Sequence, residues 1–105
     1  MASRIKDGAQ QFRSIFRSVI FQTVSFNPTA PADGAGETLT GTVSGAALGD
    51  LVLFAPPYSL EGRLAYAWVS AANTVSIRLQ NETAGSVTDL AAADWNVWVL
   101  QPFVA

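Results

Sequence analysis

The residues of this chain that could do acid–base chemistry are carboxylates, and they are few. Asp89 and Asp94 lie five residues apart in an alanine-rich segment, and Glu61 and Glu82 lie in expected connections. Two neighbouring carboxylates can divide the roles of general acid and general base, as in glycoside hydrolysis. Such spacing alone seldom marks a site. We therefore expect these four residues to be solvated loop side chains.

Nucleophilic catalysis and metal binding lack their usual residues. The 105 residues include no histidine and no cysteine, and Lys6 is the only lysine. A serine or threonine nucleophile needs a neighbouring base, which near neutral pH is most often histidine. Thiolate metal sites are excluded, and no Asp-x-Asp-x-Asp-Gly calcium loop occurs. We expect a protein that is not an enzyme and that uses no cofactor.

The composition suggests that another chain covers part of the surface. Half of the residues are apolar and only 13% are charged, against an average of about 25%. The alternative is that Ala, Ser and Thr residues form an uncharged surface exposed to solvent. No apolar run reaches the length of about 18 residues that spans a bilayer. We expect no membrane segment and no secretory signal, and a protein made in a cytoplasm or assembled there into something larger.

The charges divide the chain into a basic N-terminal arm, residues 1–20, and an acidic body, residues 21–105. Residues 1–18 carry a net charge of +3, and residues 19–105 a net charge of −5. Apolar residues recur at spacings of three and four from Phe12 onward, which predicts a short helix that forms only when docked, or an extended segment. The arm residues that we expect to bind a partner are Arg4, Lys6, Phe12, Arg13, Ile15, Phe16 and Arg17.

The partner of this arm is expected to be an acidic protein surface. A few cations in the arm, next to an acidic body, are only weak evidence for binding of nucleic acid. A solvated terminus that contacts nothing remains open, but apolar residues such as Phe12 and Phe16 would be wasteful there.

The body contains a series of short segments with the pattern of β-strands. They span residues 19–26, 37–44, 51–55, 64–71, 74–80 and 95–100. Alternation places Val24 and Phe26 inward, and likewise Val75, Ile77 and Leu79. Residues 51–55 are apolar on both faces, as expected of a central strand covered on each side. The pattern predicts an all-β fold, a small antiparallel β-sandwich or jelly-roll-like barrel of about six to eight strands.

Large aromatic residues are the remaining candidates for binding. Trp95 and Trp98 are three apart, so in a strand they face opposite sides and at least one faces away from the core. We expect Tyr66, Trp68, Trp95 and Trp98 to lie in the core or at a subunit interface, because aromatic residues dominate both. A platform that stacks on sugars, which Tyr58 could join, is the alternative.

The order of three motifs resembles a family of small virion proteins of bacteriophages. The motifs are GDLVLFAPP at residues 49–57, AYAWVSAANTVSIRLQN at residues 65–81 and DWNVWVL at residues 94–100. They consist of turns, strand ends and core residues and carry no activity of their own. The resemblance covers about residues 37–101 and leaves out the arm. It implies a β-sandwich that works as an assembled part of a virion, often as a trimer.

From this resemblance and the split charge we expect a non-enzymatic structural protein of a phage virion, assembled in the host cytoplasm. It would decorate or cement the capsid shell as a homotrimer, with the basic arm docked on the major capsid protein or another virion protein. No nucleic acid and no membrane would take part. A tail fibre, spike or neck component that binds a receptor or carbohydrate is the alternative.

Overall fold

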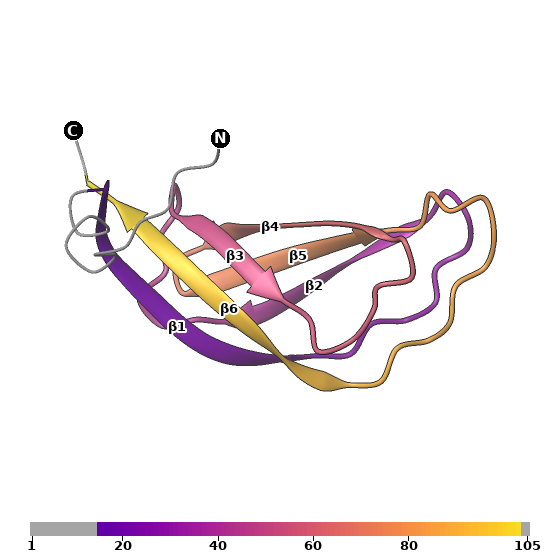
Figure 1. The fold of residues 1–105 in the computed structure, drawn as a ribbon. Coiled ribbons are helices and arrows are strands. Elements are labelled where there is room, and N and C mark those ends of the chain that lie inside the picture. The colour runs from indigo at the N-terminus through magenta and orange to yellow at the C-terminus, as the bar shows by residue number, and fades with distance from the viewer. Residues whose placement is uncertain (1–14, 104–105) are drawn as a thin grey trace, which may run out of the picture.

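Six antiparallel strands form two three-stranded sheets that pack face to face (Figure 1). The computed structural model describes residues 15–103. The strands are β1 (Phe16–Phe26), β2 (Gly36–Thr42), β3 (Leu51–Ala55), β4 (Leu64–Ala71), β5 (Thr74–Gln80) and β6 (Ala93–Pro102). This arrangement confirms the all-β antiparallel sandwich predicted from the sequence. No helix in the described part is long and apolar enough to cross a membrane.

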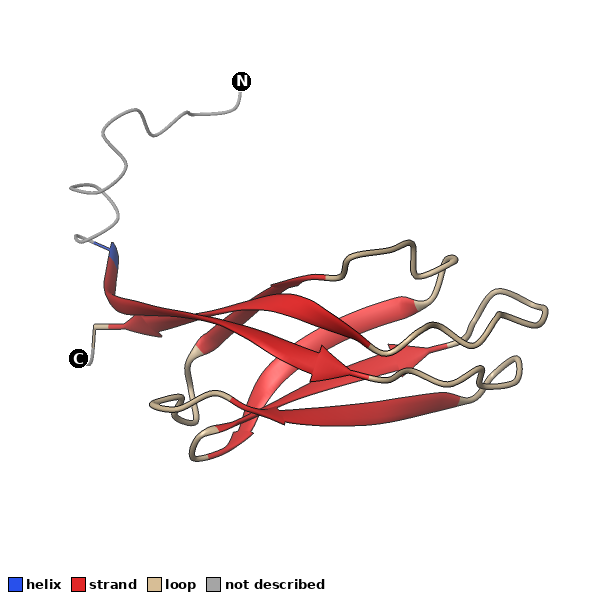
Figure 2. Cartoon of the chain, turned by 90° about the horizontal axis from the view of Figure 1, so that it is seen from below, coloured by secondary structure: helices blue, strands red, loops and turns tan. Residues whose placement is uncertain are grey.

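The two sheets differ in how far apart in the sequence their strands lie. Sheet A has the order β1-β6-β3, and sheet B has the order β2-β5-β4. In sheet B, β4 and β5 form a hairpin whose turn residue Asn73 has a φ of 62°, a conformation that asparagine tolerates. Sheet A instead joins the two ends of the body, because β1 pairs with β6. Figure 2 shows the strands of both sheets joined by loops.

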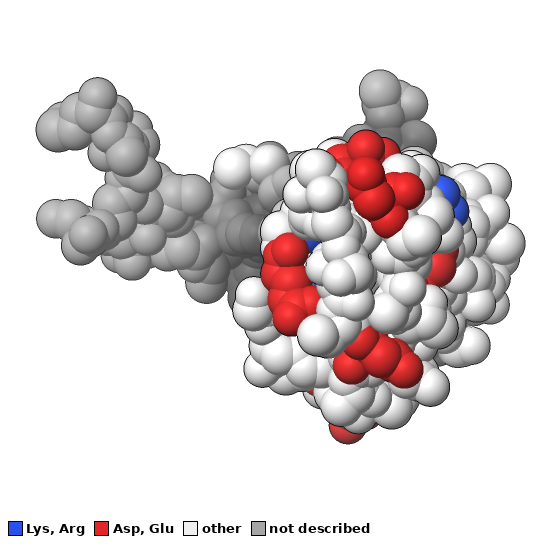
Figure 3. All heavy atoms as spheres, turned by 90° about the vertical axis from the view of Figure 1, so that its right-hand side faces the viewer, with Lys and Arg blue, Asp and Glu red and all other residues white. Residues whose placement is uncertain are grey.

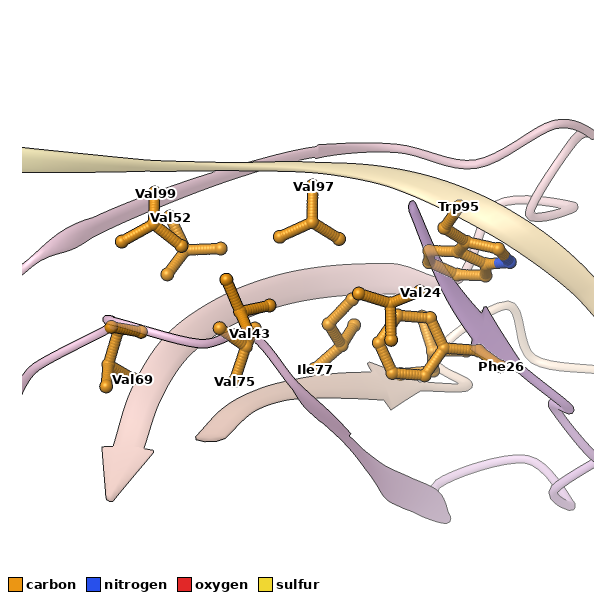
Figure 4. Packing of buried hydrophobic residues seen from close by; sticks show 12 residues of the cluster. Val24, Phe26, Val43, Val52, Val69, Val75, Ile77, Trp95, Val97 and Val99 are labelled. Atoms are coloured by element: carbon orange, nitrogen blue, oxygen red, sulfur yellow. The ribbon is translucent and has the colours of Figure 1, made fainter. Parts of the chain in front are cut away.

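The core lies between the inner faces of the sheets and is centred on β5 and β6. Alternation along these strands sends fully buried side chains inward: Val75, Ile77, Trp95, Val97 and Val99, which Figure 4 labels, and also Leu79. Val24 and Phe26 of β1 join them, as the sequence predicts. Gly41 makes room for this packing, because a Cβ atom at residue 41 would lie 2.2 Å from Cγ1 of Val24.

The first strand begins earlier than the sequence pattern indicates. Residues 16–20, which the sequence assigns to the arm, pair with β6 from Pro102 to Val99. The extended alternative is therefore confirmed for these residues, of which Val19 and Ile20 also belong to the strand predicted over 19–26, and the helical alternative is wrong for them. Ser18 and Ile20 face inward while Val19 and Phe21 face outward, so the same stretch also fits a strand. The rest of the predicted helix, and the arm up to residue 14, lies outside the described residues.

Strand β3 is an edge strand, which corrects the prediction of a central strand covered on both sides. It pairs only with β6, and the central strand of sheet A is β6 itself. Val52 points into the core, whereas Leu51 and Leu53 point outward and are exposed. The apolar content of β3 on its second face therefore requires another explanation.

Candidate interaction surface

The outer face of sheet A is apolar over the part that lies nearer the start of β1, whereas the rows through Asn96 and Asp94 are polar. Pairing across β1, β6 and β3 aligns two rows, one through Leu100 and one through Trp98. Leu100 has Val19 and Leu51 as neighbours, and Trp98 has Phe21 and Leu53. We call this surface the apolar face and define it by six residues: Val19, Phe21, Leu51, Leu53, Trp98 and Leu100.

Much of the apolar face is open to solvent. Phe21 is 55% exposed and Leu53 is 49% exposed, and Val19 and Leu51 are similar. The rings of Phe21 and Trp98 contact each other, with centroids 5.4 Å apart. Beside them lies an open apolar pocket of about 350 Å³, lined by Val19, Leu53, Trp98 and Leu100. A contiguous apolar patch of this kind, unlike a single exposed leucine, marks an interaction surface.

The structure places the four aromatic residues predicted for an interface in three different environments. Trp98 lies half-buried on the apolar face, whereas Tyr66 and Trp68 lie on the outer face of sheet B. Trp95 is 0% exposed and packs against Phe26. Trp95 therefore belongs to the core of its own chain, which is one of the two places expected for it, and does not lie at a subunit interface. The prediction that Trp95 and Trp98 face opposite sides is confirmed.

Three of the predicted arm residues fall within the described part of the chain. Ile15 and Arg17 are exposed at the start of β1, and Phe16 is half-buried. The start of β1 adjoins the apolar face, since Val19 follows Arg17 by two residues. The other predicted partner-binding residues are Arg4, Lys6, Phe12 and Arg13, and they lie outside the described residues.

Sequence reasoning missed most of the apolar face. Val19, Phe21, Leu51 and Leu53 were not among the predicted interface residues. The signal was present in β3, where residues 51–55 are apolar on both faces. In a strand covered by only one sheet, that pattern indicates that something else covers the second face.

Of the four carboxylates considered for acid–base chemistry, Glu61, Glu82 and Asp89 are exposed in loops, as expected, whereas Asp94 is exposed within β6. Figure 3 looks onto the loop end of the sandwich, where the acidic side chains lie as separate groups. Residues 15–103 contain no group of three or more carboxylates that could hold a metal ion. The Glu61 carboxylate instead joins two loops, because it accepts hydrogen bonds from the Thr88 backbone N–H at 2.9 Å and from the Thr88 hydroxyl at 2.8 Å.

These hydrogen bonds make the stability of the fold depend on pH through Glu61. The Thr88 N–H lowers the pKa of Glu61 below its ordinary value, with help from the Thr88 hydroxyl and the positive charge of Arg63. A carboxylate with a depressed pKa in the folded state contributes stability above its unfolded pKa. That contribution is lost as the pH falls through the folded pKa.

We expect Glu61→Gln to be less stable than the wild type near neutral pH, with the difference shrinking in acid. Urea unfolding of both proteins across a pH series measures this difference. A difference that stays constant from neutral pH into acid contradicts the role given to the ionised carboxylate, since glutamine does not titrate.

Asn81 begins a sequon, Asn81-Glu82-Thr83, but its side chain is fully buried and engaged. Its amide nitrogen donates to the Pro31 and Gly85 carbonyls, both at 2.9 Å, and its amide oxygen accepts from Thr83. A glycan cannot be attached to a nitrogen enclosed in this way while the chain is folded. Asn81 therefore stabilises the loops, and the apolar face remains the best candidate for an interaction site.

No protein-family model, no curated protein and no solved structure matches this chain.

Proposed function

We propose that this chain is a non-enzymatic structural protein of a bacteriophage virion that decorates or cements the capsid shell. It would act as a homotrimer that buries the apolar face between subunits, with the basic arm docked on the major capsid protein. The observation that carries this proposal is the apolar face itself, because six apolar side chains on one outer face suit contact with another protein.

Burial of the apolar face by a second copy is favoured by its composition. Apolar surface gains about 25 cal/mol for each Å² removed from water. Aromatic residues at the centre and a lack of charge are typical of interface cores, and Trp98 stands at the centre with Phe21 against it. Three copies can turn their apolar faces toward a common threefold axis, which closes the assembly and removes these faces from solvent.

The capsid as the site of this assembly is supported by the sequence. The resemblance to phage virion proteins covers about residues 37–101, and the charges separate a basic arm from an acidic body. Ile15 and Arg17 lie at the start of β1, beside the apolar face. The loops at the other end of the sandwich contain Glu61, Glu82 and Asp89 (Figures 1 and 3). The molecule is thus electrically polar along its length, which suits one fixed orientation on a shell.

We expect Leu53→Asp to convert a trimer into a monomer, because it places a charge on the buried face directly beside Trp98. Leu64→Asp is a matched control, since Leu64 is also an exposed leucine in a strand but lies on sheet B. Sedimentation velocity of the two variants and the wild type measures the assembly state. A wild type that stays monomeric at high concentration, or equal effects of the two substitutions, contradicts burial of the apolar face between copies.

We expect the double variant Arg13→Glu, Arg17→Glu to be retained on capsid shells about tenfold more weakly than the wild type. The shells are those of the phage that encodes the chain, prepared without it, and retention is measured by co-sedimentation. Arg13→Lys, Arg17→Lys keeps the charge and serves as the control. Equal retention of all three proteins, or retention of none, excludes docking on the capsid through the arm.

A further inference from the structure

The outer face of sheet B differs in character from the apolar face. Pairing across β2, β5 and β4 aligns Thr38, Arg78 and Tyr66 in one row. The next row along the strands holds Thr40, Ser76 and Trp68. An aromatic column on β4 therefore runs beside a polar column on β5 and a column of threonines on β2. We call these six residues the aromatic face.

The two rings of the aromatic face lie together and remain accessible. The centroids of Tyr66 and Trp68 are 5.4 Å apart, and their planes differ by 30°. Tyr66 is 58% exposed and Trp68 is 37% exposed, so both offer apolar ring surface to solvent. Neither ring faces the core, so packing of the fold does not require two adjacent aromatic residues on this surface.

Arg78 is held in place on this face by neutral groups. Its guanidinium donates to the Thr38 hydroxyl at 3.3 Å and to the Gln80 side-chain oxygen at 3.0 Å. The Gln80 amide in turn donates to the Gly34 carbonyl at 3.0 Å, which fixes its orientation. Among residues 15–103, Arg78 forms no ion pair; the single salt bridge there joins Arg63 and Glu61. The aromatic face thus presents a positioned cation that no carboxylate of the described residues contacts directly; the Glu82 carboxylate is one partner removed, where it accepts from the Gln80 amide at 2.9 Å.

We propose that the aromatic face binds a polysaccharide whose sugars carry carboxylates. The C–H face of a sugar ring is apolar and packs on an aromatic ring, as Tyr66 and Trp68 allow. The sugar hydroxyls find donors and acceptors in the Thr38 and Thr40 hydroxyls. A sugar carboxylate supplies the partner that Arg78 lacks, and guanidinium–carboxylate pairs are among the stronger hydrogen-bonded contacts.

A saccharide fits this face better than a nucleic acid, which also stacks on aromatic rings. Binding to a phosphate backbone needs several cations, whereas the aromatic face has Arg78 alone; a saccharide that packs on Tyr66 and Trp68 needs Arg78 for only one of its carboxylates. The proposal is independent of the capsid role, because the aromatic face and the apolar face lie on opposite outer sides of the sandwich.

The test uses tetragalacturonic acid, its methyl ester as the neutral counterpart, and a short oligothymidylate. Binding to the full-length protein is followed by backbone and arginine side-chain NMR shifts. We expect saturable binding of the acid with a dissociation constant of about 1 mM, typical of a shallow site with few contacts. The ester should bind about tenfold more weakly, because it lacks the charge that Arg78 pairs with.

Three substitutions locate the site. We expect Trp68→Ala to weaken binding of the acid at least about tenfold, and Arg78→Gln to remove the preference for the acid over the ester. Phe21→Ala, an exposed aromatic residue on the apolar face, should leave binding unchanged. Tyr66→Ala replaces Trp68→Ala if the latter does not fold, as judged by circular dichroism. Tighter binding of the oligothymidylate than of the acid, no saturable binding of either sugar, or an equal loss in Phe21→Ala overturns the proposal.

Discussion

Replacing Trp95 by alanine is expected to lower the free energy of unfolding by about 3–5 kcal/mol. The indole is fully buried and contacts the rings of Phe26, Phe54 and Tyr58, with centroids 5.3, 6.0 and 6.1 Å away. Its Nε1–H donates to the Tyr58 hydroxyl at 3.2 Å, and that hydroxyl donates to the Ala91 carbonyl at 2.8 Å. Alanine leaves a cavity and breaks this chain of hydrogen bonds. Equilibrium unfolding in guanidinium chloride measures the loss.

Trp98→Ala is the matched control, because it makes the same change three residues away in the same strand. Trp98 is half-buried on the apolar face, so its removal should cost the monomer about 1 kcal/mol or less. Both variants are measured at a concentration at which they are monomeric, since assembly would add stability of its own. Equal losses in the two variants contradict the assignment of Trp95 to the core and Trp98 to the interaction surface.

The strands of sheet B could be predicted almost residue by residue. The ranges 64–71 and 74–80 agree with β4 and β5 as observed, and Val75, Ile77 and Leu79 face inward as predicted. Strand β5 alternates strictly, and a two-residue turn with Asn73 joins it to β4, so local sequence alone indicates their pairing. Only the structure shows that β2 pairs with the other edge of β5.

Sheet A could not be predicted in the same way, because its pairings join distant parts of the chain. The apolar content of β3 on both faces is compatible with a central strand and with an edge strand covered by another molecule. Only the order β1-β6-β3 distinguishes the two, and no local pattern encodes it. For the same reason the alignment of Phe21, Trp98 and Leu53 could not be read from the sequence.

The start of β1 shows a second limit of periodicity. Phe12, Ile15, Phe16, Val19 and Ile20 have helical spacing, yet Phe16, Ser18 and Ile20 also share one face of a strand. Short stretches can satisfy both periods. In the structure, residues 16–20 pair with β6, and the backbone hydrogen bonds to that neighbouring strand favour the strand over the helix.

The residues that hold the loop end together carried no signal at all. Arg63 and Asn81 are both buried polar residues that form hydrogen bonds to other loops as well as within their own. Sequence spacing places Arg63 in a connection, where an arginine is ordinarily solvated. Its structural role follows only from the folding of the three loops 27–35, 56–63 and 81–92 around it.

Replacing Arg63 by methionine is expected to lower the free energy of unfolding by about 3 kcal/mol or more. The guanidinium donates to the Thr29 carbonyl at 3.1 Å, the Leu60 carbonyl at 3.1 Å and the Thr88 carbonyl. One side chain thus links the loop after β1, the loop after β3 and the loop after β5. Methionine keeps the apolar stem but leaves these carbonyls without their donor, and a hydrogen bond from a charged donor contributes about 1.5–3 kcal/mol.

Equilibrium unfolding measures the total loss, and amide hydrogen exchange shows where it falls. Exchange should accelerate first in the loops that hold Thr29 and Thr88, because they lose their shared donor, while β5 and β6 keep their protection. Arg78→Met is the matched control: Arg78 lies on an outer face, and its loss should cost about 0.5 kcal/mol or less. If Arg63→Met proves as stable as Arg78→Met, the loops are held by Glu61, Asn81 and Tyr58 alone. The free energy lost when the guanidinium leaves water would then cancel the gain from its hydrogen bonds, as happens for some buried charges.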